Sequence, residues 1–379
     1  MKKKWTRGEK WLWATPLVFG LVAVCIAFVP RATRRVLGWP ESLITTPDND
    51  IRSMALSRNG EVLAAAGSIN TKRGWKRGSG TIYLWDARTA KRLATIAPVY
   101  TRDSTGFIDG FDIYGLTLSP DAKRIGFSRV GQNWALYDVA TQKQLWSFPN
   151  DVSDAEFSRD GRFIALSAAN IVIVNASNGR VRTQWKRSGS SNSEDLAWSP
   201  DGTWIAIIGD YKAGNPIELY RADNGKLVRR IQGTRAISGE TVGSVAFSPD
   251  SRQLVVAASV GNYDSTDNFN LFSPVRCYDT STGRSLWEVK ALNFGGADGS
   301  HSSFCDAIFS PDGRIVAAYQ YSEGKVFLLD SATGEIRTTL NFGRATPSSF
   351  FVPPSLEFSP DGKRLFARGR SEVLFWDLE

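Results

Sequence analysis

The sequence predicts an all-β fold: a seven-bladed β-propeller of four-stranded antiparallel blades, closed by an N-terminal strand and preceded by one transmembrane helix. Three observations lead to this prediction: a turn motif that occurs seven times, the spacing of its copies, and an uncharged run of twenty residues near the N-terminus. We therefore expect a basic flank at 1–10, a transmembrane helix at 11–30, a linker at 31–41 and a propeller at 42–379.

The uncharged run begins at Trp11 and ends at Pro30, between Lys10 and Arg31. Twenty helical residues at about 1.5 Å each span roughly 30 Å, the thickness of the hydrocarbon core of a bilayer. A cleaved signal peptide and a buried core helix are the alternatives. The run is longer than the apolar region of a typical signal peptide, and the charged residues that flank it at both ends disfavour a buried helix. Basic residues are more numerous before the run, which favours a cytoplasmic N-terminus and a periplasmic or extracellular propeller.

The turn motif starts at serines 57, 119, 158, 199, 248, 310 and 359, and its full form is Ser-Pro-Asp-Gly. Proline fixes φ, aspartate hydrogen-bonds its own backbone and glycine accepts positive φ, so each copy reverses the chain. The intervals run from 39 to 62 residues, and the short ones match the roughly 40–45 residues of a four-stranded propeller blade.

Alternating apolar residues before and after each turn predict the first two strands of a blade. A third strand ends in pairs such as Trp85-Asp86 or Tyr278-Asp279, and a fourth follows a second tight turn. The last unit stops after its third strand, at Glu379, while residues 42–46 form a strand-like piece before the first unit. We expect this piece to complete the seventh blade, because closing the ring removes an open sheet edge.

The repeated units resemble the WD-repeat family of β-propellers, over about residues 51–379. The endings Leu84-Trp85-Asp86 and Phe375-Trp376-Asp377 carry this resemblance. The Gly-His pair of that family is missing and its structural aspartate is irregular, so the chain looks like a loose relative. The run from Tyr278 to Gly283, followed by Trp287, also looks like a quinoprotein repeat.

Antiparallel blades place the first and third turns on one face and the other connections on the opposite face. The insertions belong to the second kind of connection, so we expect that face to bind a partner. Aromatic and arginine side chains are favoured binding anchors. The candidate partner-binding residues are Arg73, Trp75, Lys76, Arg77, Tyr263, Asp264, Phe269, Phe350 and Phe351. The alternative is that these loops pack over one another or over the central channel.

Composition restricts the chemistry. One histidine, His301, excludes a multi-histidine metal cage, and three cysteines exclude a disulfide scaffold. His301 as a general base, and Asp264, Asp267 and Asn268 as calcium ligands, lack the motifs such sites require. Cys277 and Cys305 are expected to be buried free thiols rather than a disulfide. We expect no catalytic residue, no metal and no cofactor.

The formal charge of +8 belongs mainly to residues 1–42, which carry eight basic and two acidic side chains. The remainder is nearly neutral, so no nucleic-acid partner is expected. The preferred function is a membrane-anchored, non-enzymatic propeller that binds a protein partner, itself expected to be membrane-associated. The alternatives are a quinoprotein-like enzyme or cofactor binder and a small-ligand sensor, since one fold hosts many functions.

Overall fold

The structure is a computed structural model. It describes residues 42–45, 50–68, 81–96, 113–129, 133–150, 152–186, 195–208, 216–231, 240–263, 269–272, 274–289, 305–320, 324–341, 355–369 and 372–378. The expected transmembrane segment, 11–30, and its flanks lie outside these ranges. Within them, no helix has the length and apolar character needed to cross a membrane.

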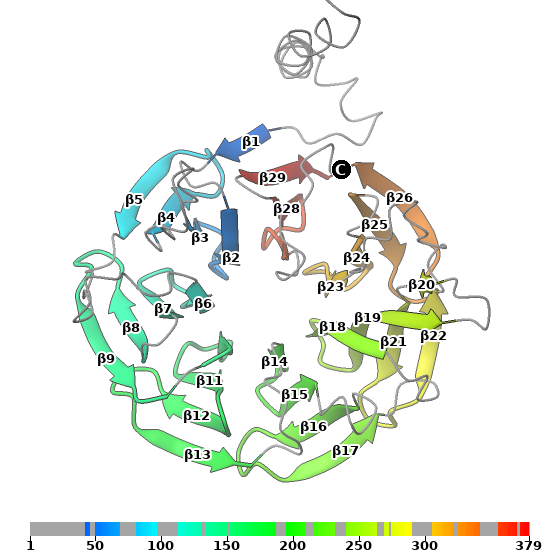
Figure 1. Cartoon of the computed structure of the whole chain (residues 1–379), viewed down its shortest axis with the longest axis horizontal. Helices are drawn as coiled ribbons and strands as arrows, with labels where there is room; N and C mark the ends of the chain where they lie inside the picture. Colours follow the sequence, from blue (N-terminus) through cyan, green and yellow to red (C-terminus); the bar gives the residue numbers. More distant parts are fainter. Residues whose placement is uncertain are drawn as a thin grey trace, which may run out of the picture.

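Seven antiparallel sheets follow one another around a ring, in sequence order, and confirm the predicted blades (Figure 1). Blades 1 to 3 are β2–β5 (Asp50–Leu56, Val62–Ser68, Thr81–Asp86, Arg92–Ile96), β6–β9 (Ile113–Leu118, Arg124–Arg129, Trp134–Asp138, Gln144–Phe148) and β10–β13 (Asp154–Phe157, Phe163–Ser167, Ile171–Asn175, Val181–Trp185). Blade 4 is β14–β17 (Leu196–Trp198, Trp204–Ile208, Ile217–Arg221, Leu227–Ile231).

Blade 5 contains β18 (Glu240–Phe247), β19 (Gln253–Tyr263), β21 (Val275–Asp279) and β22 (Ser285–Val289), with β20 (Phe269–Phe272) paired to β19 outside this order. Blade 6 is β23–β26 (Cys305–Phe309, Ile315–Gln320, Lys325–Asp330, Ile336–Asn341). Blade 7 is β27 (Leu356–Phe358), β28 (Arg364–Arg368), β29 (Glu372–Asp377) and β1 (Ser42–Thr45).

The serine of each first turn organises that turn. In blade 6, Ser310 Oγ donates to Asp312 Oδ1 at 2.6 Å and accepts from the amide of Ile315 at 3.0 Å. The same pair of bonds occurs around Ser119, Ser158, Ser199, Ser248 and Ser359. These turns are tight because their polar groups are satisfied locally, as the sequence predicts.

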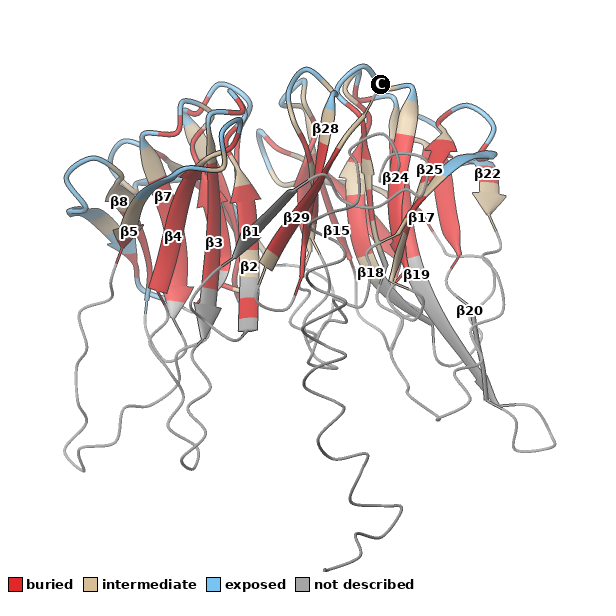
Figure 2. Ribbon diagram, turned by 90° about the horizontal axis from the view of Figure 1, so that it is seen from above, coloured by how far each residue is buried: buried red, intermediate tan, exposed pale blue. Residues whose placement is uncertain are grey.

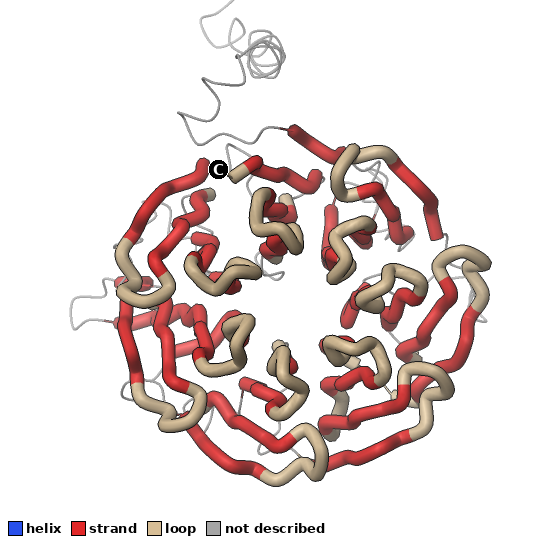
Figure 3. The backbone as a smooth tube through the Cα atoms, turned by 180° about the vertical axis from the view of Figure 1, so that it is seen from behind, coloured by secondary structure: helices blue, strands red, loops and turns tan. Residues whose placement is uncertain are grey.

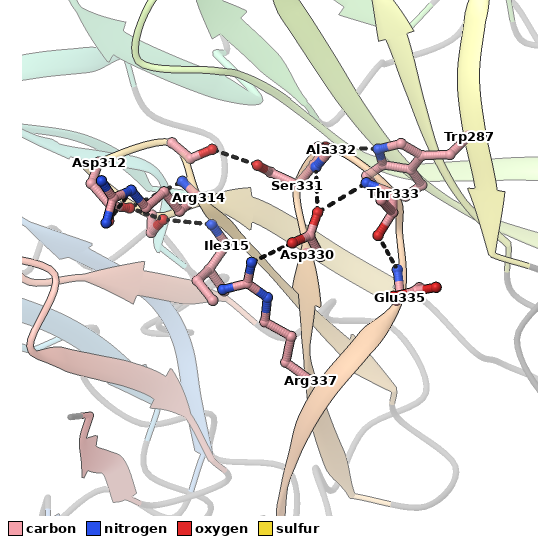
Figure 4. Close-up of polar contacts among 12 residues, drawn as sticks. Trp287, Asp312, Arg314, Ile315, Asp330, Ser331, Ala332, Thr333, Glu335 and Arg337 are labelled. Atoms are coloured by element: carbon pink, nitrogen blue, oxygen red, sulfur yellow. Dashed lines mark hydrogen bonds and ion pairs between the residues drawn. The ribbon is translucent and has the colours of Figure 1, made fainter.

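The second turn of blade 6 is closed by an aspartate and covered by a tryptophan of the preceding blade. In blade 6, Asp330 Oδ1 accepts from the amides of Ala332 and Thr333 (Figure 4). Trp287 of blade 5 donates from Nε1 to Ser331 O at 2.8 Å, and its ring lies 2.8 Å from where a Cβ on Gly334 would be. Only glycine fits beneath this tryptophan, and Gly334 also has φ +77°.

The hydrophobic cores lie between neighbouring blades. Trp134 and Leu136 of blade 2 pack with Phe157, Ile164 and Val172 of blade 3, and equivalent clusters join other blades. Each blade therefore contributes both faces of its sheet to burial, which explains its nearly continuous apolar second strand.

The predicted closing strand is confirmed. β1 pairs antiparallel with β29, with Leu43 opposite Leu374 and Ile44 opposite Val373. Two arginines of blade 7 also reach blade 1: Arg364 Nη1 donates to Ala87 O and Arg88 O at 3.0 Å, and Arg368 donates to Ile51 O. The first and last blades are thus joined by both a shared core and charged hydrogen bonds.

Candidate functional site

The propeller has two different faces. The tight turns of the blades lie together on one side and are largely exposed, and we call this side the tight-turn face (Figures 2 and 3). The strand ends that lead to the connections between second and third strands, and between blades, lie on the opposite side, which we call the long-connection face. Antiparallel pairing in each sheet requires this arrangement, so the predicted assignment of turns to faces is correct.

Blade 5 carries a projection on the long-connection face. β19 leaves its last pair with β21 at Ala257 opposite Val275 and continues to Tyr263, pairing with β20 instead. These six additional residues extend the strand by about 20 Å at about 3.3 Å per residue. Residues Val260 to Tyr263 pair antiparallel with Phe269 to Phe272, so this part of blade 5 is a β-hairpin.

The hairpin brings two predicted site residues together. Tyr263 and Phe269 are directly opposite in the β19–β20 register, and Asp264 follows Tyr263 outside the described ranges. The other candidates, Arg73, Trp75, Lys76, Arg77, Phe350 and Phe351, also lie outside them, as do His301, Asp267 and Asn268. These remain predictions.

A feature that we did not predict lies along the central channel. In blade 3, Asp154 Oδ2 accepts from the amide of Leu196 in blade 4 at 2.9 Å. Asp195 accepts in the same way from Val245 of blade 5, Ser244 from Ala307 of blade 6, and Asp306 from Leu356 of blade 7. In blades 3 to 6, side chains at the inner edge thereby satisfy amides on the unpaired edge of the next blade.

Two glutamates make a second set of such bonds. Glu156 Oε2 accepts from the amide of Trp198 at 2.5 Å, and Glu357 accepts from the amide of Leu56, across the junction between blades 7 and 1. We call Asp154, Glu156, Asp195, Asp306 and Glu357 the channel carboxyls. They connect consecutive blades through most of the ring.

The channel carboxyls have raised pKa values because they lie deep within the ring. Burial raises the pKa of Asp154 and of Asp306 to about 6, and that of Glu156 and of Glu357 to about 8. Burial, and then the charges of Asp154, Asp306 and Glu156, raise the pKa of Asp195. The channel can therefore hold protons near neutral pH.

The repeat does contain a signal for these residues. Four positions before the turn serine, six of the seven units carry serine or aspartate: Ser53, Asp154, Asp195, Ser244, Asp306 and Ser355. Such a polar position in an otherwise apolar strand marks contact with the unpaired edge of the next blade. The described residues contain no group of three or more His, Cys, Asp or Glu side chains arranged to hold a metal ion.

No family model matches the chain. An uncharacterised WD repeat-containing protein of Synechocystis sp. is 30% identical over 187 residues, which cover 48% of this chain and 45% of that protein. WD repeat-containing protein 1 of Gallus gallus is 26% identical over 189 residues, 49% of this chain and 26% of that protein. The chain is a WD-repeat-like β-propeller. The matches span less than half the length of both relatives.

A solved structure supports the propeller fold over more of the chain. Hydrazine synthase of Kuenenia stuttgartiensis superposes with a TM-score of 0.66, covering 88% of this chain and 97% of that chain at 14% identity. At that identity the likeness concerns the fold alone.

The structure gives a packing role to the repeats that resemble quinoproteins. Trp287 and Trp146 each cover a glycine in the turn of the next blade, and Trp146 donates from Nε1 to Ala176 O at 3.1 Å. Cys277, on β21, is a buried free thiol as predicted, and burial raises its pKa to about 12. Cys305 lies on β23, and its side chain is not described.

Proposed function

We propose that this WD-repeat-like propeller is a membrane-anchored interaction module that binds a protein partner through its long-connection face. The membrane anchor is residues 11–30, on the charge pattern given above. The propeller supplies a rigid ring, and its irregular connections are concentrated on one side. Such loops on a stiff scaffold are the usual place for recognition.

The projecting β19–β20 hairpin is the observation that carries the proposal. Tyr263 and Phe269 stand opposite each other at its end, and tyrosine and other large aromatic residues serve as anchors in protein interfaces. The pairing of β20 with β19 adds nothing to the closure of blade 5, which has four strands without it. A structured projection that the fold does not need fits a recognition element.

The test is purification of the full chain from its native membranes, followed by identification of what accompanies it. We expect a protein partner in stoichiometric amount, lost in the double variant Tyr263→Ala/Phe269→Ala. The matched control is Leu286→Ala, which removes an apolar side chain that is 48% exposed on β22 of the same blade. Retained binding in the hairpin variant contradicts the choice of face.

The same purification separates the other functions. A visible-absorbing cofactor in the isolated protein would favour a quinoprotein-like enzyme or cofactor binder instead. Stabilisation by a small metabolite, in the absence of any protein partner, would favour a sensor. Protease accessibility of a C-terminal tag in sealed vesicles tests whether the propeller lies on the periplasmic or extracellular side.

A further inference from the structure

Charge is unevenly distributed over the tight-turn face. The turns of blades 1 to 3, at 57–62, 86–93, 119–124, 138–145, 158–163 and 175–182, carry eleven basic and five acidic side chains, a net charge of +6. The corresponding described turns of blades 4 to 7, at 199–204, 221–228, 248–253, 279–286, 310–315, 330–337, 359–364 and 377–378, carry eight basic and nine acidic side chains. We call the first group of turns the basic sector.

The basic side chains of this sector are mostly exposed, with Arg162 paired to Asp160, while the acidic ones accept hydrogen bonds within their turns. Ten of the eleven are exposed: Arg58, Arg88, Lys91, Arg92, Lys123, Lys143, Arg159, Arg162, Arg180 and Arg182. All five acidic groups, Glu61, Asp86, Asp121, Asp138 and Asp160, accept hydrogen bonds from groups of their own turns. The outer surface of the sector is therefore more positive than the count of its charged residues indicates.

Charges of blades 1 and 3 act on each other in this sector. Burial, and then the charge of Arg159 in blade 3, lower the pKa of Arg58 in blade 1, and Glu156 in the channel offsets this in part. An anion bound at the sector would relieve this repulsion.

The sector also has a suitable shape and position. The tight turns of the blades all lie on one side of the ring (Figure 2). Leu378 donates to Lys363 O in the first turn of blade 7, so β29 ends at the tight-turn face. β1 runs antiparallel to it, with Ser42 opposite Phe375, so Ser42 is the end of β1 nearer that face.

We propose that the basic sector docks on the surface of a bilayer that contains anionic phospholipid. This rests on the proposed membrane anchor, which the eleven residues 31–41 hold within about 40 Å of Ser42 at about 3.5 Å per residue. Tethering at that distance makes a weak surface contact effectively intramolecular. Docking would turn the long-connection face, with its β19–β20 hairpin, away from the membrane.

A planar surface explains the observations better than an acidic protein. The basic side chains are spread over three blades and two concentric rings of turns (Figure 3), and the exposed large apolar side chains among them, Leu93, Leu145 and Val181, lie on three different blades and are not aromatic. Long-range attraction to many headgroups needs only such a distribution, at about fivefold in partitioning for each basic residue near the surface. A protein interface of this size would be expected to include buried aromatic anchors.

The experiment is amide hydrogen exchange on the full chain reconstituted in nanodiscs of phosphatidylcholine, alone or mixed with phosphatidylglycerol. We expect exchange at 86–93, 138–145 and 158–163 to slow in the anionic discs only, and to recover at high salt. The variant Lys143→Glu/Arg159→Glu/Arg180→Glu should weaken docking by at least about 100-fold. The control Arg252→Glu/Arg284→Glu/Arg314→Glu makes the same charge change on blades 5 and 6 and should retain it.

Equal exchange in the two kinds of disc, or equal loss in the control variant, overturns the proposal. Protection that appears only after an acidic partner protein is added also overturns it. Retention of the chain in neutral discs tests whether residues 11–30 anchor it, independently of docking by the basic sector. If residues 11–30 do not anchor the chain, flotation with anionic vesicles still tests the basic sector. Salt-sensitive binding that is lost in Lys143→Glu/Arg159→Glu/Arg180→Glu supports the proposal, and absence of binding overturns it.

Discussion

Replacing Glu156 with glutamine should stabilise the propeller at neutral pH and weaken the dependence of its stability on pH. Burial raises the pKa of Glu156 to about 8, from an ordinary value of 4.5. Between these two values the native state binds more protons than the unfolded state, so the free energy of unfolding falls as the pH rises. Glutamine is neutral throughout and keeps a carbonyl oxygen that can accept from the amide of Trp198.

The magnitude follows from the shift. At pH 7 the native side chain is still largely protonated while the unfolded one is ionised, and this difference costs about 3 kcal/mol. The Glu156 residue is partly exposed, so this is an upper value. At pH 5 the cost falls to about 1 kcal/mol. For a propeller of this length, with an unfolding entropy near 0.7 kcal/mol/K, 3 kcal/mol corresponds to a Tm increase of about 4 °C.

Thermal unfolding of the full chain, followed by circular dichroism between pH 5 and pH 8.5, measures this. The difference in Tm between Glu156→Gln and the wild type should grow as the pH rises. The control Glu156→Ala removes the acceptor and leaves the Trp198 amide unpaired, which should cost about 1–3 kcal/mol. If the wild type and Glu156→Gln give parallel curves, the channel carboxyl does not titrate as the structure implies.

Two further substitutions test the packing of the ring. Gly225 has φ +70° and would place a Cβ 2.5 Å from Trp185, so Gly225→Ala should destabilise the protein by about 3 kcal/mol or more. The control Gly202→Ala, at φ +77° with open space around it, should cost about 1 kcal/mol. Chemical denaturation measures both, and equal losses would mean that the Trp185 side chain moves aside. Arg364→Ala removes the charged hydrogen bonds from blade 7 to two carbonyls of blade 1 and should lower the free energy of unfolding by about 2 kcal/mol. The control Arg314→Ala replaces a side chain that is 81% exposed and should change it by less than about 0.5 kcal/mol. A comparable loss in both arginine variants would contradict the role of Arg364 in ring closure.

The fold was predictable because its main determinants are local. A serine, an aspartate or asparagine, and a residue with positive φ close each first turn locally, so the motif is visible wherever it occurs. Counting the copies gives the number of blades. The closing strand was also predicted correctly, because residues 42–46 have a strand-like pattern and β1 pairs with β29.

The channel carboxyls were not predicted because their partners belong to other blades. The amide that Asp154 satisfies lies 42 residues away, and that of Asp195 lies 50 residues away. Nothing in the strand around either aspartate shows that partner until the blades are placed in a ring. The recurring polar position identifies the contact only in retrospect.

The candidate site was predictable in part. Antiparallel pairing places the ends of the second and third strands on the face that we expected to carry the insertions. The pairing of Tyr263 with Phe269 was not visible, because the residues between them resemble an ordinary polar loop. The remaining candidates, from Arg73 to Phe351, stay predictions.

The most direct test places a photo-crosslinking amino acid at two positions of the full chain in its native membrane. One is Phe269, at the end of the hairpin on the long-connection face, and the other is Lys143, in the basic sector of the tight-turn face. We expect a single protein adduct from position 269 and adducts with lipid alone from position 143. A protein adduct from position 143 combined with none from position 269 would contradict the proposed orientation and function.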